Sequence, residues 1–189
     1  MTLRPASSLH VSEWLNTSSP VSLDALRGRV VMIEVFQMLC PGCVSQGLPQ
    51  AQRIERLFGP QGLVVLGLHS VFEHHEAQGS RDALEAFLHE YRIRFPVGID
   101  EPAGRGGPPR TMQAYALQGT PTTLLIDARG RVRKKKFGVE SDLAMGAEIM
   151  ALLLEADAMV ATSTGPDTDI DTEVPGAGCT PEGCALPAA

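Results

Sequence analysis

The sequence predicts a single α/β domain, and three observations lead to this prediction. Short apolar runs typical of strands buried on both faces alternate with longer segments in which apolar residues recur every three or four positions. The chain has 189 residues, about the length of one domain, and its 43% hydrophobic and 20% charged residues are close to the average for globular proteins. We therefore expect one compact domain over residues 1–159, followed by a disordered acidic tail over residues 160–189.

The predicted elements follow the order strand, helix, strand, helix, then a short helix, a hairpin and a last helix. Continuous apolar runs and one turn signal indicate the strands, and apolar residues at helical spacing indicate the helices. The predicted strands are residues 29–37, 63–68, 122–126 and 131–137, and the predicted helices are residues 41–58, 83–91, 112–117 and 141–159. Residues 100–111 hold three Gly and three Pro and are expected to form a loop. Residues 1–28 are a polar segment in which Trp14, Leu15, Leu23 and Leu26 are expected to pack against the core.

The negative charge is concentrated in the tail. The chain has a formal net charge of −6, and residues 160–189 contain five acidic residues and no Lys or Arg, so the body is nearly neutral. A protein that binds nucleic acid or an anionic membrane needs a clear basic excess, which the body lacks. The only basic run, residues 129–136, is expected to be the charged edge of the hairpin.

No apolar run reaches the roughly 18 residues of a membrane-spanning helix. Residues 1–20 lack the apolar stretch of a secretory signal. We therefore expect a cytoplasmic protein whose partners include neither nucleic acid nor a membrane.

The cysteines form two pairs, Cys40 with Cys43 and Cys179 with Cys184. In a cytoplasmic protein, paired cysteines more often indicate redox catalysis or metal binding than structural disulfides. A zinc site would need a second ligand pair at suitable spacing, and the second cysteine pair lies over 130 residues away. The sequence therefore favours redox chemistry and predicts neither a metal nor another cofactor.

Cys40-Pro41-Gly42-Cys43 lies where a predicted buried strand meets a predicted helix. The unpaired N–H groups and the positive dipole end of a helix N-terminus stabilise a thiolate. We therefore expect Cys40 to be the nucleophile. Cys43, one turn into the helix, is expected to be the resolving thiol.

Three segments carry a family resemblance: LDALRGRVVMIEVF leading into CPGC, the sequence GTPT at residues 119–122, and the hairpin sequence LLIDARGRV. On these segments the chain resembles the thioredoxin superfamily, in particular its TlpA-like and redoxin (AhpC/TSA-related) branch, over roughly residues 12–159. The resemblance implies a thioredoxin-like fold, with a central mixed β-sheet flanked by helices and a C-terminal β-hairpin and helix. It also implies that Pro121 is a cis proline beside the cysteine pair and that the Thr120 backbone offers an edge to a substrate polypeptide.

Glu34 is the only polar residue in the apolar run over residues 30–36 and lies six residues before Cys40. The resemblance matches it to the buried acid that thioredoxins use as proton acceptor for the resolving cysteine. Desolvation would raise the pKa of an unpaired carboxyl group there, which suits proton exchange with Cys43 near neutral pH. The alternative is a structural acid paired with a Lys or Arg at the end of the sheet.

The chain departs from the family pattern at three places. Met38 and Leu39 stand where many relatives have a Trp before the first cysteine, so we expect an apolar but softer substrate-binding rim. Pro49 sits one residue later than the usual helix-kinking proline, which implies a local insertion in the first helix. The peroxiredoxin signature P-x3-T-x2-C is absent before Cys40 and Cys43, which disfavours peroxidase chemistry by that route.

Two further groups of residues could take part in chemistry. His69, His74 and His75 would allow metal binding together with the cysteine thiolates, but copper-handling relatives need a His at Thr120-Pro121, so we expect solvated histidines in a loop. The tail pair, Cys179 and Cys184, has no helix dipole or basic neighbour and is more suited to a shuttle than to primary attack.

The predicted function is that of a thiol:disulfide oxidoreductase. Its partners would be a disulfide-containing protein or small thiol substrate and an upstream reductant. The tail pair would relay electrons to the active site or be an incidental reactive tail. The alternatives are a redoxin-type thiol peroxidase with an antioxidant role, and a metal or mercurial carrier.

Overall fold

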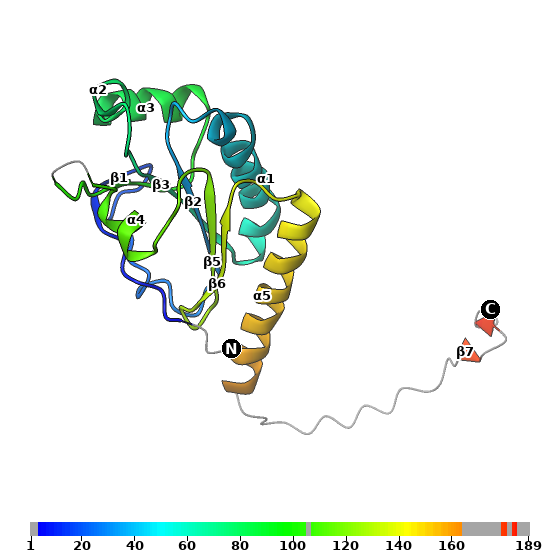
Figure 1. Cartoon of the computed structure of the whole chain (residues 1–189). Coiled ribbons are helices and arrows are strands. Elements are labelled where there is room, and N and C mark those ends of the chain that lie inside the picture. Colours follow the sequence, from blue (N-terminus) through cyan, green and yellow to red (C-terminus); the bar gives the residue numbers. More distant parts are fainter. Residues whose placement is uncertain (1–3, 105–106, 164–178, 181–182, 185–189) are drawn as a thin grey trace.

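The computed structural model describes residues 4–104, 107–163, 179–180 and 183–184 (Figure 1). Its centre is a six-stranded sheet with the strand order β1-β4-β3-β2-β5-β6. The strands are β1 (Val11–Leu15), β2 (Val31–Phe36), β3 (Val64–His69), β4 (Val97–Asp100), β5 (Thr122–Ile126) and β6 (Val132–Phe137). Strands β2, β3 and β4 are mutually parallel, whereas β1, β5 and β6 pair antiparallel with their neighbours. The predicted α/β fold with a mixed central sheet is confirmed.

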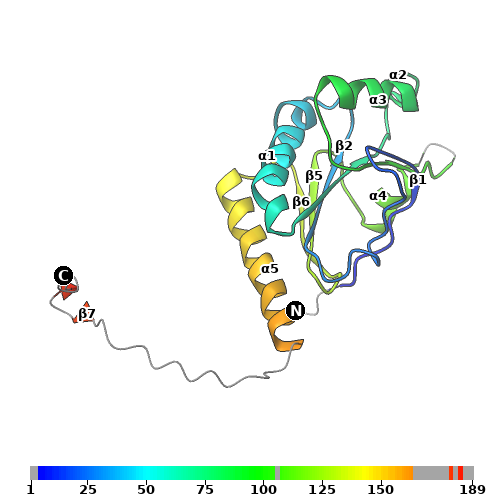
Figure 2. The same cartoon turned by 180° about the vertical axis from the view of Figure 1, so that it is seen from behind.

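The helices cover the sheet on both sides. They are α1 (Leu48–Phe58), α2 (His75–Gln78), α3 (Arg81–Glu90), α4 (Arg110–Ala114) and α5 (Asp142–Ser163). Figures 1 and 2 show α1 and α5 next to each other on one side of the sheet and α4 on the other side. The last helix continues beyond its predicted end at residue 159, since no Gly or Pro interrupts the chain before Gly165. The tail was predicted to be disordered over residues 160–189, but residues 160–163 continue helix α5, and residues 179–180 and 183–184 pair as two short strands. The other tail residues lie outside the described residues.

Strand β2 lies between the two hydrophobic clusters of the core, one on each side of the sheet, and all six of its residues are buried. Met32 and Phe36 face the cluster that contains residues of α1, α3 and α5, whereas Val31 and Ile33 face the opposite cluster. This division follows from the alternation of side chains along a strand. Residues of the N-terminal segment pack against the core, as expected: Trp14, Leu23 and Leu26 lie against the second cluster, and Leu15 belongs to the first.

Two strands of the six-stranded sheet, β1 and β4, are missing from the sequence prediction. Strand β1 is an outer strand that exposes Ser12 and Glu13, so it lacks a continuous apolar run. Strand β4 has four residues and ends directly before the Gly- and Pro-rich loop, which makes it too short for a periodic signal. Both strands pair with neighbouring strands in the folded sheet, but their own sequences carry no strong strand pattern.

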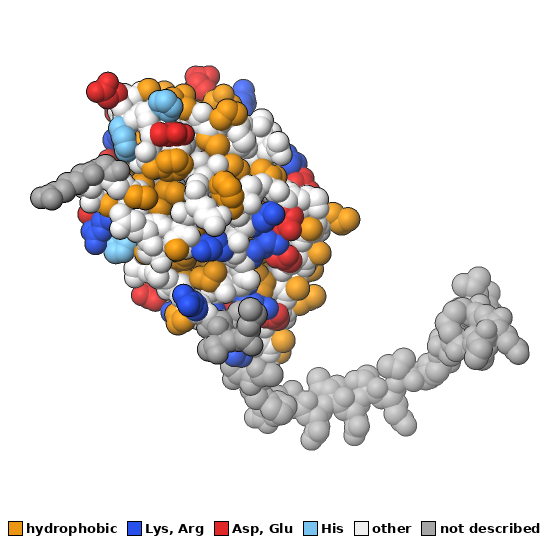
Figure 3. All heavy atoms as spheres, in the orientation of Figure 1, with side chains coloured by type: hydrophobic (Ala, Val, Ile, Leu, Met, Phe, Trp, Pro, Cys, Tyr) orange, Lys and Arg blue, Asp and Glu red, His pale blue; other side chains and the backbone are white. Residues whose placement is uncertain are grey.

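Strand β6 forms the outer edge of the sheet and carries the basic run, as predicted. Two of its cations are paired with acids: Lys134 Nζ lies 2.5 Å from both Glu140 Oε2 and Glu148 Oε1, and Arg133 contacts Glu155. Figure 3 shows basic and acidic side chains interspersed on this face. The basic run therefore serves as a charged strand edge. Within the described part of the chain, no helix is long and apolar enough to cross a membrane.

Leu68 on β3 is fully buried, whereas Leu154 on α5 keeps 61% of its surface exposed. We expect Leu68→Ala to lower the free energy of unfolding by about 2–5 kcal/mol, because it removes buried methyl groups and leaves a cavity. Leu154→Ala is the matched control and should change it by less than about 0.5 kcal/mol. Urea denaturation measures both, and equal effects would contradict the assignment of the core.

Candidate active site

The first cysteine pair lies where β2 passes into the helical segment. After Phe36 the chain turns, with the Cys40 N–H donating to the Gln37 carbonyl oxygen at 3.2 Å, and it becomes helical from residue 41. Cys40 is partly exposed, whereas Cys43 is completely buried. The predicted position of this pair at a helix N-terminus is confirmed.

The two sulfur atoms are in contact and have different surroundings. They lie 2.6 Å apart as free thiols, and the Cys43 N–H donates to Cys40 Sγ at 3.2 Å. A helix-start N–H directed at sulfur stabilises a thiolate on Cys40. Burial, and next the hydrogen bond to Cys40, raise the pKa of the Cys43 thiol above its ordinary value. The arrangement thus favours an accessible nucleophile at Cys40 and a protonated thiol at Cys43.

The Thr120–Pro121 peptide bond faces this pair and is cis, as the resemblance implies. Cys40 Sγ lies 3.6 Å from the Thr120 carbonyl oxygen. Pro121 is buried against the start of the helix, where a Cβ atom at Gly42 would lie 3.3 Å from Pro121 Cδ. The loop is fixed from its other side by the Gly138 N–H, which donates to the Pro121 carbonyl oxygen at 2.9 Å.

Glu34 lies in the middle of β2 and is 1% exposed. Its Oε2 accepts a hydrogen bond from Thr123 Oγ1 at 2.8 Å, and its Oε1 has no hydrogen-bond partner among the described residues. Burial raises the pKa of Glu34 to about 8, against the smaller lowering effect of the Thr123 hydroxyl. The alternative of an acid paired with Lys or Arg is wrong for the part of the chain that the structure describes.

The three histidines do not share one environment. His74 and His75 are exposed, as expected, although His75 begins helix α2 and does not lie in a loop. His69 is the last residue of β3 and is only 2% exposed. The expectation was wrong for His69 because the strand extends one residue beyond its predicted end. Its ring lies 5.3 Å from that of Phe36, and burial lowers its pKa to about 4, so it is neutral at pH 7.

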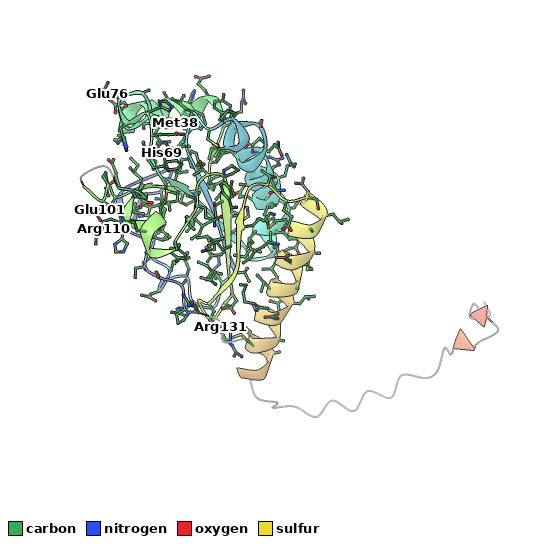
Figure 4. The ribbon with its side chains drawn as sticks, viewed as in Figure 1. Met38, His69, Glu76, Glu101, Arg110 and Arg131 are labelled. Atoms are coloured by element: carbon green, nitrogen blue, oxygen red, sulfur yellow. The ribbon has the colours of Figure 1, made fainter. Side chains whose placement is uncertain are left out.

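The described residues contain no cluster of three or more His, Cys, Asp or Glu side chains that could hold a metal ion. His69 Nε2 likewise has no hydrogen-bond partner there. In Figure 4, His69 and Met38 are both labelled at the end of the sheet where β2 and β3 finish.

The predicted substrate-binding rim is only partly open. Leu39 keeps 55% of its surface exposed, but Met38 is 7% exposed and belongs to the core. The prediction that Met38 lines the substrate-binding rim is therefore wrong. Adjacent residues in a turn point in different directions, so one of two neighbouring apolar side chains can be buried while the other is exposed. Of the two, Leu39 alone is available to a substrate.

Two glutamines that the sequence did not indicate hold the turn before Cys40. Gln78 Oε1 accepts a hydrogen bond from the Leu39 N–H at 3.1 Å, and Gln78 Nε2 donates to Gln37 Oε1 at 3.0 Å. Both side chains are buried. A Gln directly after an apolar strand was the one available signal for Gln37, whereas nothing in the local pattern marks Gln78.

Phe137 is a further missed residue, at the end of β6. It pairs with Thr122 across the hairpin, and its ring packs on Gly119, where a Cβ atom would lie 3.0 Å from the ring. The side chain keeps 52% of its surface exposed. An exposed aromatic ring therefore borders the loop that contains Thr120.

The Redoxin family model matches residues 5–152 of the chain. The chain belongs to the Redoxin family. Among solved structures, it is similar to the thioredoxin-like superfamily protein SPOA0173, with 53% identity, a TM-score of 0.76, and coverage of 79% of this chain and 96% of that chain. It is also similar to a thiol-disulfide isomerase from Corynebacterium glutamicum, with 46% identity, a TM-score of 0.75 and the same coverage. These similarities confirm the thioredoxin-like fold.

Among curated proteins, this Redoxin-family chain is 28% identical over 177 residues to protein DipZ of Mycobacterium tuberculosis, covering 91% of this chain and 24% of DipZ. The chain thus spans about a quarter of the length of DipZ. It is 23% identical to the thiol-disulfide oxidoreductase ResA of Bacillus cereus, covering 64% of this chain and 62% of ResA. ResA is named a thiol-disulfide oxidoreductase, and the similar Corynebacterium glutamicum structure is named a thiol-disulfide isomerase.

Replacement of Glu34 by Gln should change how stability depends on pH. The folded pKa of about 8 lies above the ordinary value of 4.5, so between these values the folded protein binds one proton more than the unfolded chain. The stability of the wild type therefore falls as pH rises through this range, by about 1.4 kcal/mol per pH unit.

Denaturation of wild type and Glu34→Gln at several pH values tests this expectation. The free energy of unfolding of the variant should increase relative to the wild type from pH 5 to pH 8 and stay level above pH 8. A difference that does not vary with pH would show that Glu34 is not buried as a neutral acid.

Proposed function

We propose that the protein reduces disulfide bonds of polypeptide or small-molecule substrates through Cys40 and Cys43. The observation that carries this proposal is the pairing of a partly exposed Cys40 sulfur, which receives a helix-start N–H, with a buried Cys43 thiol at 2.6 Å. The reductive direction is part of the proposal and requires a compartment that keeps thiols reduced.

The reaction proceeds in two exchanges. The Cys40 thiolate attacks one sulfur of the substrate disulfide, which forms a mixed disulfide and releases the other sulfur as a thiolate that takes up a proton. The Cys43 thiol then loses its proton and attacks Cys40 Sγ, which forms the Cys40–Cys43 disulfide and releases the second substrate thiolate. The substrate gains two electrons and the cysteine pair loses two, so an external thiol reductant must restore the pair.

Glu34 is proposed to accept the Cys43 proton in the second exchange. Only its carboxylate form can accept a proton, and the pKa of about 8 means that this form becomes more abundant as pH rises from 7 to 8. Resolution should therefore be faster at the upper end of this range. In the reverse direction the protonated carboxyl group returns the proton to Cys43.

The substrate is proposed to lie along the Thr120–Pro121 edge, where the Thr120 carbonyl oxygen lies 3.6 Å from Cys40 Sγ. An extended polypeptide can pair with such a backbone edge. The exposed side chains of Leu39 and Phe137 supply apolar contacts beside it. A small disulfide would use the cysteine pair without these contacts.

Cysteine variants test the proposed roles. Cys40→Ser should abolish reduction of insulin disulfides, and Cys43→Ser should accumulate mixed disulfides, because attack is retained and resolution is lost. In the reduced wild type, alkylation at pH 6 should modify Cys40 faster than Cys43. Equal alkylation rates would contradict the assignment, and consumption of hydrogen peroxide at a rate comparable to insulin reduction would favour the thiol peroxidase alternative.

We further propose that Cys179 and Cys184 exchange electrons with the active site of the same chain. The two strands β7 (Cys179–Thr180) and β8 (Gly183–Cys184) pair antiparallel with Cys179 directly opposite Cys184. Directly paired residues of antiparallel strands have Cα atoms about 4.5–5.5 Å apart, within the range of disulfides. This register supports a dithiol that can close to a disulfide.

The length of the chain allows this exchange. Helix α5 starts beside the cysteine-bearing helix, where Gln50 Nε2 donates to Asp142 Oδ1 at 2.7 Å, and its 22 residues extend about 33 Å to Ser163. The 15 residues 164–178 span at most about 50 Å when extended. The second pair can therefore reach Cys40 from the far end of α5.

Mass spectrometry of oxidised Cys43→Ser tests the relay. In this variant Cys40 cannot close onto Cys43, so we expect an intramolecular disulfide from Cys40 to Cys179 or Cys184. Recovery of only intermolecular disulfides, or of the Cys179–Cys184 disulfide alone, would refute the relay.

A further inference from the structure

Gly47 lies in the helical segment that carries Cys43, and its own backbone does not require a glycine. Its φ of −58° and ψ of −56° are ordinary helical values that any L residue adopts. In a helix interior, Gly lowers stability by roughly 0.5–1 kcal/mol relative to Ala. The reason for a glycine must therefore lie in what surrounds position 47.

The space beside Gly47 is filled by the Glu34 carboxyl group. A Cβ atom at Gly47 would overlap Glu34 Oε1 and would lie 3.1 Å from Pro121 Cβ. Oε1 is the carboxyl oxygen that has no hydrogen-bond partner in the described part of the chain. The carboxyl group thus occupies the volume that a side chain at position 47 would take.

An extra residue in the helix accompanies this contact. Residues Cys43–Gly47 form a π-helical turn, η1, in which the Leu48 N–H donates to the Cys43 carbonyl oxygen five residues earlier. An α-helix would pair residues four apart, so the turn contains one additional residue. This extra residue accounts for the position of Pro49, one residue later than in relatives, from which we predicted a local insertion in the first helix. The turn has Cys43 at its first position and Gly47 at its last, and both are buried.

We propose that Gly47 is a positioning residue for proton transfer: without a side chain at this position, the Glu34 carboxyl group lies against the π-helical turn that carries Cys43. The proposal rests on the proposed role of Glu34 as proton acceptor. Gly47 itself exchanges no proton. A side chain at Gly47 would push either the carboxyl group or the turn away, and both displacements would lengthen the path between Glu34 and Cys43.

The test measures the two exchanges separately in the full-length protein. Cys179 and Cys184 are replaced by Ser so that only the active site reacts. Reduced protein is mixed with the aromatic disulfide 5,5′-dithiobis(2-nitrobenzoate) in a stopped-flow spectrophotometer. The first coloured thiolate reports attack by Cys40, and the second reports resolution by Cys43.

The variants are Gly47→Ala, Glu34→Gln and the double variant, with Gly59→Ala as the matched control. Gly59 is also helical, with φ of −54°, and a Cβ atom there meets no residue within 4 Å apart from its chain neighbours. We expect Gly47→Ala to slow the second phase about tenfold or more and to change the first phase less than about twofold, because a lost proton acceptor affects resolution. Gly59→Ala should leave both phases unchanged.

The double variant decides whether Gly47 acts through Glu34. We expect the double variant to resolve no more slowly than Glu34→Gln alone, and the rise of the wild-type second phase between pH 7 and pH 8 to be lost in all three variants. An equal slowing by Gly47→Ala in both backgrounds, or no slowing at all, would overturn the role of Gly47 alone. An unchanged second phase in Glu34→Gln would refute the proposed role of Glu34 as well.

A shorter acid provides a second readout that remains valid if Gly47→Ala folds poorly. Glu34→Asp withdraws the carboxyl group from position 47 by one methylene group. We therefore expect Gly47→Ala combined with Glu34→Asp to have a higher free energy of unfolding than Gly47→Ala alone. Equal or lower stability of the combined variant would show that the Glu34 carboxyl group does not occupy this volume, which would overturn the proposal.

Discussion

The carboxyl group of Glu34 lies in the core with one hydrogen bond and without a cation among the described residues, and much of the active site depends on how the fold accommodates it. Burial of a charged group without a partner costs far more than burial of a neutral one. The carboxyl group therefore keeps its proton over most of the physiological pH range, in line with its pKa of about 8. The same burial makes it able to give and take a proton near neutral pH, at the cost of stability at higher pH.

Strands β2 and β5 and the helical segment after β2 supply the groups that surround the Glu34 carboxyl group. Strand β2 carries Glu34 and leads to Cys40, while β5 places Thr123 directly opposite Glu34 and follows the Thr120–Pro121 loop. The helical segment contributes the buried Cys43. The two thiols consequently differ in accessibility and in hydrogen bonding, although only two residues separate them. In the proposed mechanism, this asymmetry allows the Cys40 sulfur to attack an external disulfide and the Cys43 thiol to resolve the mixed disulfide.

The sequence predicted those parts of the site that depend on local pattern. The continuous apolar run of β2, the cysteines at the following helix start and the interrupting Glu34 were all visible, because each follows from one strand or one helix. The misplaced features depend on contacts between distant segments. The direction of Met38, the burial of His69 and the bond from Leu39 to Gln78 are decided by elements that pack together only in the folded chain.

The first helix contains one feature that the sequence predicted and one that only the structure shows. The position of Pro49 indicated an extra residue, but the sequence could not tell how the helix absorbs it. The structure absorbs it as a π-helical turn that brings Gly47 against Glu34. One-residue changes of this kind alter which side of a helix faces the sheet, so their effect appears only with the sheet in place.

The most direct test of this account is a titration of the Glu34 carboxyl group in the reduced protein. Carbon-13 NMR of protein labelled at glutamate side chains would follow it, with the signal assigned by its absence in Glu34→Gln. The account predicts a carboxyl group that is mostly protonated at pH 7 and has a titration midpoint near pH 8. A midpoint near the ordinary value of 4.5 would contradict it, because an acid already ionised at neutral pH would be solvated or paired with a cation.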